Sequence, residues 1–294
     1  MNSHLEIYAL LALALITTAP LSRGQDLAEI KERGVLRHLS IPYAQFDSGM
    51  GDGLDVELMT LFAAHLGVRY EYVRTDFSTV IGDLTGQRVK SKGEDIEVLG
   101  EAEIKGDVAA HGFTILPWRE KAVAFGTPTF PTQVWLISPA GSSYSPILPT
   151  GTLEGDIAES RKLIPGTTLM GKSGTCLDLS LYDVSAAGAT GRNFEGSLNE
   201  LAPALLSGES DLLILDVPDA LVALGKWPNQ LKVLGPMSVQ QDMAPAFRHS
   251  SPELRAAFHD FYEQCKTDGT YLALVRKYYP DVFGYYPDFF TQTP

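Results

Sequence analysis

The chain predicts an α/β protein built on parallel sheets, and three observations support this fold class. Two expected strands, Val35–Ile41 and Arg69–Thr75, flank an amphipathic helix that begins at Asp55. That strand–helix–strand order is typical of a parallel sheet with helices on its faces. A similar alternation returns between residues 156 and 234. The length of 294 residues then favours two such units rather than one.

The elements of the first unit follow in order. A short helix is expected over Leu27–Arg33, immediately before the first strand. The helix from Asp55 carries an apolar stripe and ends at Gly67, because glycine tolerates the left-handed backbone that often follows a helix. Residues 87–105 are polar and charged, so we expect a surface excursion with a hairpin through Ile96–Leu99.

The second unit is introduced by a strand over Gln133–Ser138. The segment Pro139–Thr152 that follows is rich in Gly, Ser and Pro, which indicates a domain boundary. The pattern predicts a helix after Thr175, and the capping box of Ser197 and Glu200 begins another. The expected strands of this unit are Thr168–Gly171, Leu212–Val217 and Leu231–Leu234.

The C-terminal part returns to helix. Ser251 and Pro252 suit the start of one helix, and a second is expected around Tyr271–Tyr278. The aromatic tail over Phe283–Phe290 is expected to pack on the first unit.

The N-terminus resembles a secretion signal. Ile7–Leu21 is an apolar run without charge, too short for a bilayer span but suited to the core of a signal peptide. Small residues allow a cut after Gly24. We therefore expect residues 1–24 to direct export to the periplasm, with an uncleaved N-terminal anchor as the alternative.

The charge balance narrows the range of partners. The 36 acidic residues outnumber the 23 basic ones, which disfavours binding to nucleic acid or to an anionic membrane surface. No metal-ligand or serine-hydrolase motif occurs, so we predict no cofactor, no metal and no catalytic residue. Two cysteines, Cys176 and Cys265, permit one disulfide in an oxidising compartment.

Five segments in the right order resemble the extracytoplasmic solute-binding proteins of ABC importers, in their polar amino-acid branch (family 3). The most specific is Gly112–Phe125, which reads GFTILPWREKAVAF. The resemblance implies the two-lobed type II fold of the periplasmic binding proteins, with two hinge strands and a ligand cleft between the lobes. The other segments are Leu27–Arg37, Gly53–Leu58, Leu198–Asp216 and Ser251–Tyr279.

The resemblance also implies how the chain is divided and what it does. Lobe 1 would take residues 25–132, lobe 2 residues 133–236, and residues 237–294 would form the hinge return and the rest of lobe 1. Such a monomer would bind a small zwitterion, above all an amino acid, and deliver it to an ABC permease without acting as an enzyme. Because Cys176 and Cys265 would then lie in different moving lobes, two free thiols are favoured.

Arg119 and Asp216 form the centre of the implied binding site. Arg119 matches the family arginine that holds the ligand carboxylate, for which a planar guanidinium offers two parallel hydrogen bonds. Asp216 matches the aspartate that takes the ligand ammonium. Without the resemblance, Arg119 could be a surface residue at a helix start, and Asp216 could cap the helix that follows its strand.

The same resemblance adds contacts from three loops. Gly112 and Thr114 match positions that offer backbone and hydroxyl groups to the ligand. A second loop matches one whose N–H groups, at a helix N-terminus, favour an anion; the family usually has Thr or Ser where this chain has Cys176. Aromatic residues in the remaining loops either stack on the ligand or belong to the core. These candidates are Ser173, Gly174, Thr175 and Cys176, with the aromatic residues Tyr43, Phe46 and Phe77.

A neighbouring residue and two alternative functions complete the prediction. His111 is expected to be a strand histidine with satisfied hydrogen bonds.

Gly166–Ser173 matches the phosphate-loop pattern of nucleotide hydrolases, although the charged segment before Pro165 does not suit the buried strand that such a loop follows. A cyclohexadienyl or arogenate-type dehydratase on the same scaffold would need a general acid in the cleft, for which Asp216 and Asp219 are the candidates.

Overall fold

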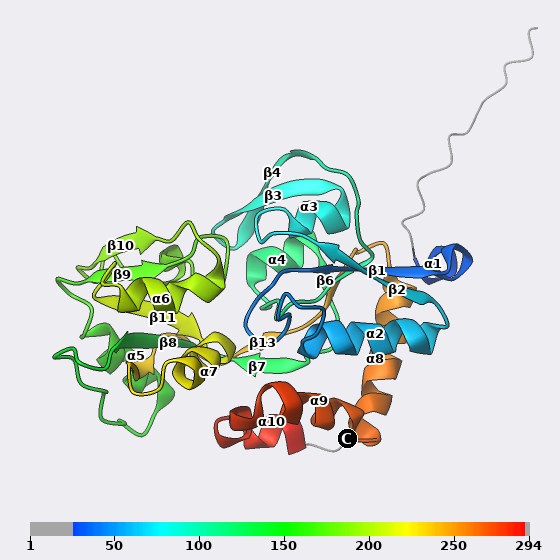
Figure 1. The fold of residues 1–294 in the computed structure, drawn as a ribbon. Helices are drawn as coiled ribbons and strands as arrows, with labels where there is room; N and C mark the ends of the chain where they lie inside the picture. The colour runs from blue at the N-terminus through cyan, green and yellow to red at the C-terminus, as the bar shows by residue number, and fades with distance from the viewer. Residues whose placement is uncertain (1–25, 292–294) are drawn as a thin grey trace, which may run out of the picture.

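The computed structural model describes residues 26–291, which fold into two lobes that each contain a five-stranded sheet (Figure 1). The predicted α/β class is therefore confirmed. The first sheet has the order β2 (Arg69–Arg74), β1 (Val35–Ser40), β5 (Val108–Ala109), β14 (Ala246–Phe247) and β6 (Ala124–Phe125). The second has the order β10 (Thr190–Asn193), β9 (Thr168–Gly171), β11 (Leu212–Asp216), β8 (Val134–Pro139) and β12 (Leu231–Pro236).

The first lobe begins with the predicted strand–helix–strand unit. β1 pairs in parallel with both β2 and β5, whereas β14 pairs antiparallel with β5 and β6. The helix between β1 and β2 buries its apolar stripe and ends at Gly67, whose φ of 73° requires the left-handed backbone. The helices of this lobe are α1 (Leu27–Arg33), α2 (Leu54–Leu66), α3 (Val80–Thr85), α4 (Pro117–Ala122), α8 (Pro252–Thr267) and α9 (Thr270–Tyr278).

The second lobe repeats the α/β pattern with one antiparallel strand. β9 pairs in parallel with β10 and β11, and β8 runs antiparallel to β11 and β12. The predicted capping box of Ser197 and Glu200 is present and leads into α6. The helices of this lobe are α5 (Leu153–Arg161), the 3-10 turns η1 (Leu179–Tyr182) and η2 (Leu198–Glu200), α6 (Leu201–Leu206) and α7 (Val217–Lys226).

Two antiparallel segments join the lobes. β7 (Phe130–Thr132) carries the chain out of the first lobe, directly before β8. β13 (Gln241–Met243) returns it to the first lobe before β14, and the two segments pair with each other. These two connections lie side by side between the lobes in Figure 1, so the remaining contacts between the lobes are made by side chains and loops on their facing surfaces.

Two predictions about the second lobe are wrong. Pro139–Thr152 is not a domain boundary, because the strands on either side of it, β8 and β9, belong to the same sheet. No α-helix begins after Thr175 either: turns and the four-residue η1 follow, because the hydroxyl of Thr175 accepts from the Leu177 N–H and bonds the Lys172 carbonyl within its own loop. Gly, Ser and Pro mark loops as readily as boundaries.

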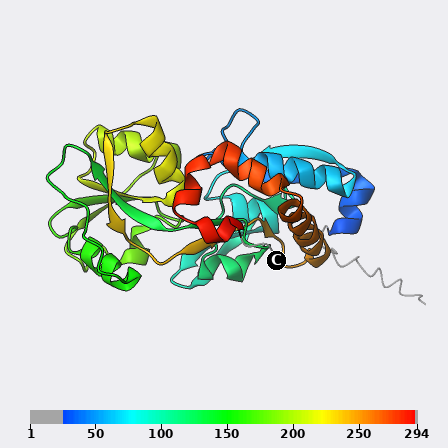
Figure 2. The same cartoon turned by 90° about the horizontal axis from the view of Figure 1, so that it is seen from below.

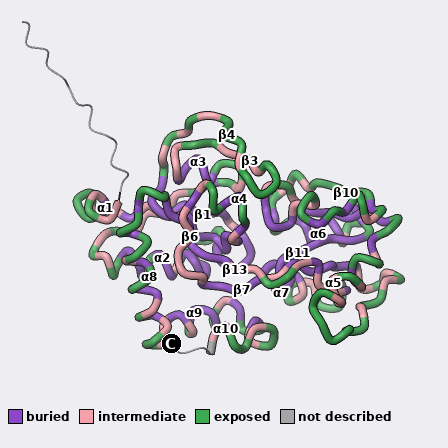
Figure 3. The backbone as a smooth tube through the Cα atoms, turned by 180° about the vertical axis from the view of Figure 1, so that it is seen from behind, coloured by how far each residue is buried: buried purple, intermediate pink, exposed green. Residues whose placement is uncertain are grey.

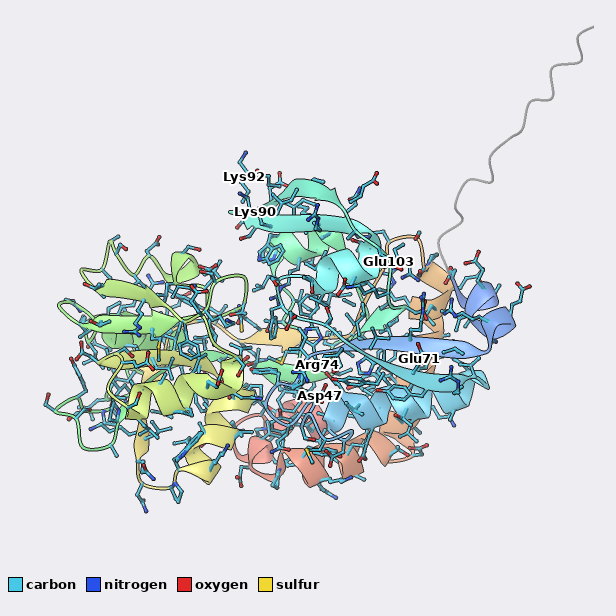
Figure 4. The ribbon with its side chains drawn as sticks, turned by 45° about the horizontal axis from the view of Figure 1, so that its top comes forward. Asp47, Glu71, Arg74, Lys90, Lys92 and Glu103 are labelled. Carbon is cyan, nitrogen blue, oxygen red and sulfur yellow. The ribbon has the colours of Figure 1, made fainter. Side chains whose placement is uncertain are left out.

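The polar excursion forms the predicted hairpin. β3 (Gln87–Lys92) pairs antiparallel with β4 (Asp95–Glu101) in a sheet of their own. Figure 4 shows Lys90 and Lys92 near the free end of this hairpin, above the body of the first lobe. An ion pair of 3.2 Å between Lys90 and Glu97 lies across the hairpin, where solvent screens it.

The aromatic tail packs against both lobes, not the first alone. It consists of η3 (Pro280–Gly284) and α10 (Pro287–Thr291), which lie along the junction of the lobes in Figure 2. Phe290 contacts Phe130 of β7, with ring centroids 5.6 Å apart. Tyr285 contacts Trp135 of β8 in the second lobe, at 5.1 Å. The predicted packing on the first lobe is confirmed, and the contact with the second lobe is an addition to it.

Buried backbone follows the sheets and the joining segments (Figure 3). All five residues of β11 are buried, and so are the three of β7. Within residues 26–291, no helix combines the length and the apolarity needed to cross a membrane. The predicted signal peptide, residues 1–24, lies outside the described residues.

Candidate functional site

Arg119 is a buried cation without a carboxylate partner. It lies in α4, and only 2 % of its surface is exposed. Its guanidinium donates to the carbonyl oxygens of Thr114 (2.8 Å) and Gly174 (2.9 Å), while Nε has no hydrogen-bond partner. The Phe113 ring lies 4.2 Å from Cζ, a cation–π contact. Burial lowers the pKa of Arg119 to about 10, and the interaction with Cys176 opposes this shift only in part.

Asp216 is the corresponding buried anion of the second lobe. It is the last residue of β11 and 2 % exposed. Its side chain caps α7, accepting from the Asp219 N–H at 3.3 Å, so the helix-cap interpretation holds. It also accepts from the Tyr43 hydroxyl of the first lobe and from the Cys176 thiol at 3.5 Å. Burial raises the pKa of Asp216, although these donors oppose the shift.

One loop of the second lobe lies between the cation and the anion. Gly174 accepts from Arg119, and Cys176, two residues later, contacts Asp216. Consecutive Cα atoms are 3.8 Å apart, so the Cα atoms of these two loop residues lie within about 8 Å of each other. The structure therefore brings the side chains of Arg119 and Asp216 to the same short loop.

The chemistry of this loop differs from the prediction. Because no helix begins there, it has no helix N-terminus to attract an anion. The N–H groups of Ser173 and Gly174 are already bonded, to Asn193 (2.7 Å) and Asp178 (3.0 Å). Ser173 is exposed, and the hydroxyl of Thr175 bonds within the loop. What faces Arg119 is the carbonyl of Gly174.

Cys176 is the loop residue that contacts Asp216. It is 5 % exposed and contributes a thiol, a weak donor, to Asp216. Burial and the Asp216 charge raise the pKa of this thiol, which keeps it protonated and unreactive. Cys176 and Cys265 are both free thiols, in agreement with the expectation that they form no disulfide.

Gly112 and Thr114 position the segment that leads to Arg119. Gly112 has a φ of 65°, and a Cβ there would lie 2.4 Å from the Phe46 ring, so only glycine suits this position. Its N–H donates to the buried carboxylate of Asp55 at 2.6 Å. Thr114 is buried and bridges to Met243 of β13. The Gly112 N–H is thus committed to Asp55, which the sequence suggested only as the start of a helix.

The three predicted aromatic residues form one cluster. Tyr43 and Phe46 are each 1 % exposed, and their rings stack with centroids 6.1 Å apart. Phe77 meets Tyr43 edge to face at the same centroid distance. Phe46 also packs against Phe130 of β7 and is a core residue, whereas Tyr43 reaches Asp216. The cluster therefore joins the first lobe's core to the charged centre.

His111 contradicts its prediction. It lies in a bend after β5 instead of in a strand, it is fully buried, and neither ring nitrogen has a hydrogen-bond partner within residues 26–291. Its ring packs between Phe77 (5.3 Å) and Phe113 (4.9 Å). Burial, with the nearby Arg119 charge, lowers the pKa of His111 well below its ordinary value, so the ring is neutral. A sequence pattern cannot show whether a strand histidine will find a partner, since partners come from other elements.

Further contacts between the lobes involve residues that sequence reasoning did not assign to the site. The side chain of Asn199, inside the capping box, accepts from the Ala44 N–H at 2.9 Å. Asp219, weighed only as a general acid, is 5 % exposed, and its Oδ2 has no hydrogen-bond partner. The motif Ser197–Glu200 pointed to a cap, and nothing in it distinguished Asn199 as a lobe contact.

The phosphate-loop alternative is wrong. Thr168–Gly171, inside the matching stretch, is strand β9 instead of a loop. The amine of Lys172 donates to the carbonyls of Phe194 (3.2 Å) and Gly196 (2.7 Å), so it is directed at the backbone of its own lobe. A phosphate cradle requires a glycine-rich loop around the anion, which this geometry does not provide.

Comparison with known proteins agrees with this fold. The model of the bacterial extracellular solute-binding proteins, family 3, matches residues 100–281, more than half of the chain. The L-cystine-binding protein TcyJ of Escherichia coli K12 is 24 % identical over 282 residues, covering 93 % of this chain and 94 % of the relative. A mutant of ArgBP from T. maritima is 25 % identical, with a TM-score of 0.67, covering 87 % of this chain and 99 % of that one.

An ancestral arginine-binding protein bound to arginine has the same TM-score, 0.67, at 24 % identity, and covers 84 % of this chain and 99 % of its own. At that identity the likeness concerns the fold. The two-lobed architecture is that of the type II periplasmic binding proteins, as the resemblance implied. The chain belongs to the bacterial extracellular solute-binding proteins of family 3, and the matched residues include Arg119 and Asp216.

Proposed function

We propose that this protein binds the zwitterionic head of one amino acid between its lobes. The observation that carries the proposal is the buried guanidinium of Arg119, which no carboxylate neutralises within residues 26–291. A buried unpaired charge costs several kcal/mol, so it is retained where a ligand supplies the counter-charge. A carboxylate on the ligand would do so.

In this proposal the two lobes contribute opposite charges. Arg119 takes the ligand carboxylate, and Asp216 takes the ammonium in the place where it now accepts from Tyr43 and Cys176. Gly112 and Thr114 hold the segment of Arg119, and Gly174 to Cys176 form the second-lobe wall. Tyr43 and Phe77 line the first-lobe side, with Phe46 behind them in the core. Ser173 and the hydroxyl of Thr175 have structural roles.

The relatives support an amino acid as the ligand class. The names of two of them specify L-cystine and arginine, and each of these carries an α-amino acid head. Closure around that head would exclude water and present a closed form to an ABC permease, in a hinge motion of the periplasmic-binding kind. We propose further that the protein acts as a monomer, with lobe 1 at 25–132 and 237–294 and lobe 2 at 133–236.

We also propose export to the periplasm through residues 1–24. The family is extracellular, and the apolar run Ile7–Leu21 has the length of a signal-peptide core. The test is Edman sequencing of the protein recovered from the periplasm of a producing bacterium. A first residue of Gln25 is expected, and an intact Met1 in the membrane fraction would contradict cleavage.

A thermal-shift screen tests the binding function. Wild-type protein is heated with amino acids, amines, organic acids, and ATP with magnesium. A ligand at 100 times its dissociation constant should add about 2.7 kcal/mol of stability, so at least one amino acid should raise the Tm clearly. Stabilisation by ATP alone would refute the proposal, and turnover of a cyclic carboxylic acid would instead favour the dehydratase.

A further inference from the structure

A cavity between the lobes opens beside the proposed head-group site. It has a volume of about 310 Å³. The loop after β1 forms its first-lobe wall with Ala44, Gln45 and Ser48, while Asn199 and one face of α7 form the opposite wall. The Ala44–Asn199 hydrogen bond, which joins the lobes, lies at its edge. A ligand held between the lobes could therefore extend into this space.

Asp219 is the buried charged residue of that cavity. It is among the residues that line the space, only 5 % of it is exposed, and its Oδ2 has no hydrogen-bond partner within residues 26–291. Its own N–H donates to Asp216 at 3.3 Å, so the two carboxylates are neighbours in the first turn of α7. Burial, with the Asp216 charge, raises the pKa of Asp219 well above its ordinary value, as expected for a carboxyl that lacks a cation.

The one cationic side chain that lines this cavity does not neutralise Asp219. Lys226 lies at the other end of α7, seven residues on, which places the two Cα atoms about 10 Å apart along the helix. Its amine lies over the Trp227 ring, 4.9 Å from the centroid. Lys226 is exposed, whereas Asp219 is buried, so the inner end of the cavity keeps an uncompensated acid.

Counting charges indicates which ligand suits this arrangement. Arg119 and Asp216 cancel one another, and the zwitterionic head of an amino acid adds no net charge. Asp219 then leaves the buried site with one unbalanced carboxyl. A ligand with a second cationic group, several bonds from its head, would remove that imbalance with a charge-assisted hydrogen bond.

We propose that Asp219 binds the distal cation of an extended amino acid whose head lies between Arg119 and Asp216. The inference rests on the proposed function and narrows its substrate class to amino acids with a side-chain ammonium or guanidinium. Neutral side chains of the same length could occupy the cavity but would leave Asp219 without a counter-charge. Asp219 is thus a specificity-determining residue of this chain.

The test compares L-arginine with L-citrulline, which has the same length but an uncharged distal group. Isothermal titration calorimetry on wild-type protein should give a dissociation constant at least tenfold lower for arginine. Asp219→Asn should bring the two constants within about twofold, mainly by weakening arginine. Glu154→Gln, at an exposed position of α5 in the same lobe, is the matched control and should keep the wild-type ratio.

The outcomes separate this inference from the proposed function. Equal affinity of the wild-type protein for arginine and citrulline would overturn the role of Asp219 and leave amino-acid binding intact. An unchanged preference for arginine in Asp219→Asn would do the same. Failure of the wild-type protein to bind any amino acid would refute both proposals. The wild-type comparison needs no variant, so it stands even where Asp219→Asn folds poorly.

Discussion

Replacing Arg119 by methionine should remove most of the affinity for an amino acid while preserving side-chain volume. The magnitude follows from the buried state of the guanidinium. A fall in pKa from 12.5 to about 10 corresponds to roughly 3 kcal/mol, at 1.36 kcal/mol per pKa unit, by which burial disfavours the charged form. A ligand carboxylate recovers that free energy. Arg119→Met should therefore raise the dissociation constant roughly 100- to 300-fold, within the range for truncation of one partner of a buried charge pair.

Calorimetric titration with L-arginine and L-cystine measures this change. Arg161→Met, at an exposed position at the end of α5, is the control and should bind as the wild type does. Agmatine, which is arginine without its carboxylate, gives a second control on the ligand side. If Arg119→Met weakens agmatine as much as arginine, or weakens neither, the assignment of the carboxylate to Arg119 is wrong.

Three further predictions concern stability and the thiols. Gly112→Ala should lower the free energy of unfolding, measured by urea denaturation, by about 2–5 kcal/mol, because the added Cβ would clash with Phe46 and the φ of 65° strains an alanine. Gly34→Ala is the control: it has a similar left-handed φ but open space around the added Cβ, so it should cost only about 1–2 kcal/mol. Burial lowers the pKa of His38 to about 4, below the value of 6.5 in the unfolded chain. As the pH falls, the unfolded state therefore binds a proton before the folded state does. About 3 kcal/mol of folding stability should be lost between pH 6.5 and pH 4. In guanidinium chloride both thiols should react with Ellman's reagent, and in the native protein both should react slowly, because Cys176 and Cys265 are buried.

Each of these has a clear contrary result. Equal losses in the two glycine variants would mean that the aromatic contact is not tight. Denaturation at a series of pH values, compared with His38→Gln, isolates the histidine, because the opposing effect of Asp55, with its pKa raised to about 7, is present in both proteins. A pH dependence unchanged by the substitution would refute the assignment. Unreactive thiols in the denatured protein would indicate a disulfide.

Local patterns predicted most of the regular structure. The helix over Leu27–Arg33 and the strand over Thr168–Gly171 have the predicted bounds. The hairpin within residues 87–105 and the capping box at Ser197 also formed. These features depend on periodicity, capping and turn residues, which act over a few positions and can be recognised in the sequence.

The errors arose where a local pattern has two outcomes. Thr175 and Asp178 suit either a helix start or a turn, and hydrogen bonds within the loop selected the turn. Pro139–Thr152 suits either a domain boundary or a surface loop, and the pairing of β8 with β11 selected the loop. His111 lies in an apolar segment whose neighbours offered its ring no partner. For Pro139–Thr152 and His111 the deciding atoms come from elsewhere in the chain, whereas at Thr175 they come from the loop itself.

The sequence alone determined the α/β class and the order of most elements, which follow from short-range spacing and residue chemistry. Arg119 and Asp216 were singled out by the resemblance of the segments around them to family 3. Only the tertiary structure decided that Arg119 is buried without a counter-charge, that Gly174 presents a carbonyl to it, and that Asp219 faces a cavity between the lobes. Burial and pairing depend on contacts between segments far apart in the chain, and a linear pattern carries no information about which of those contacts form.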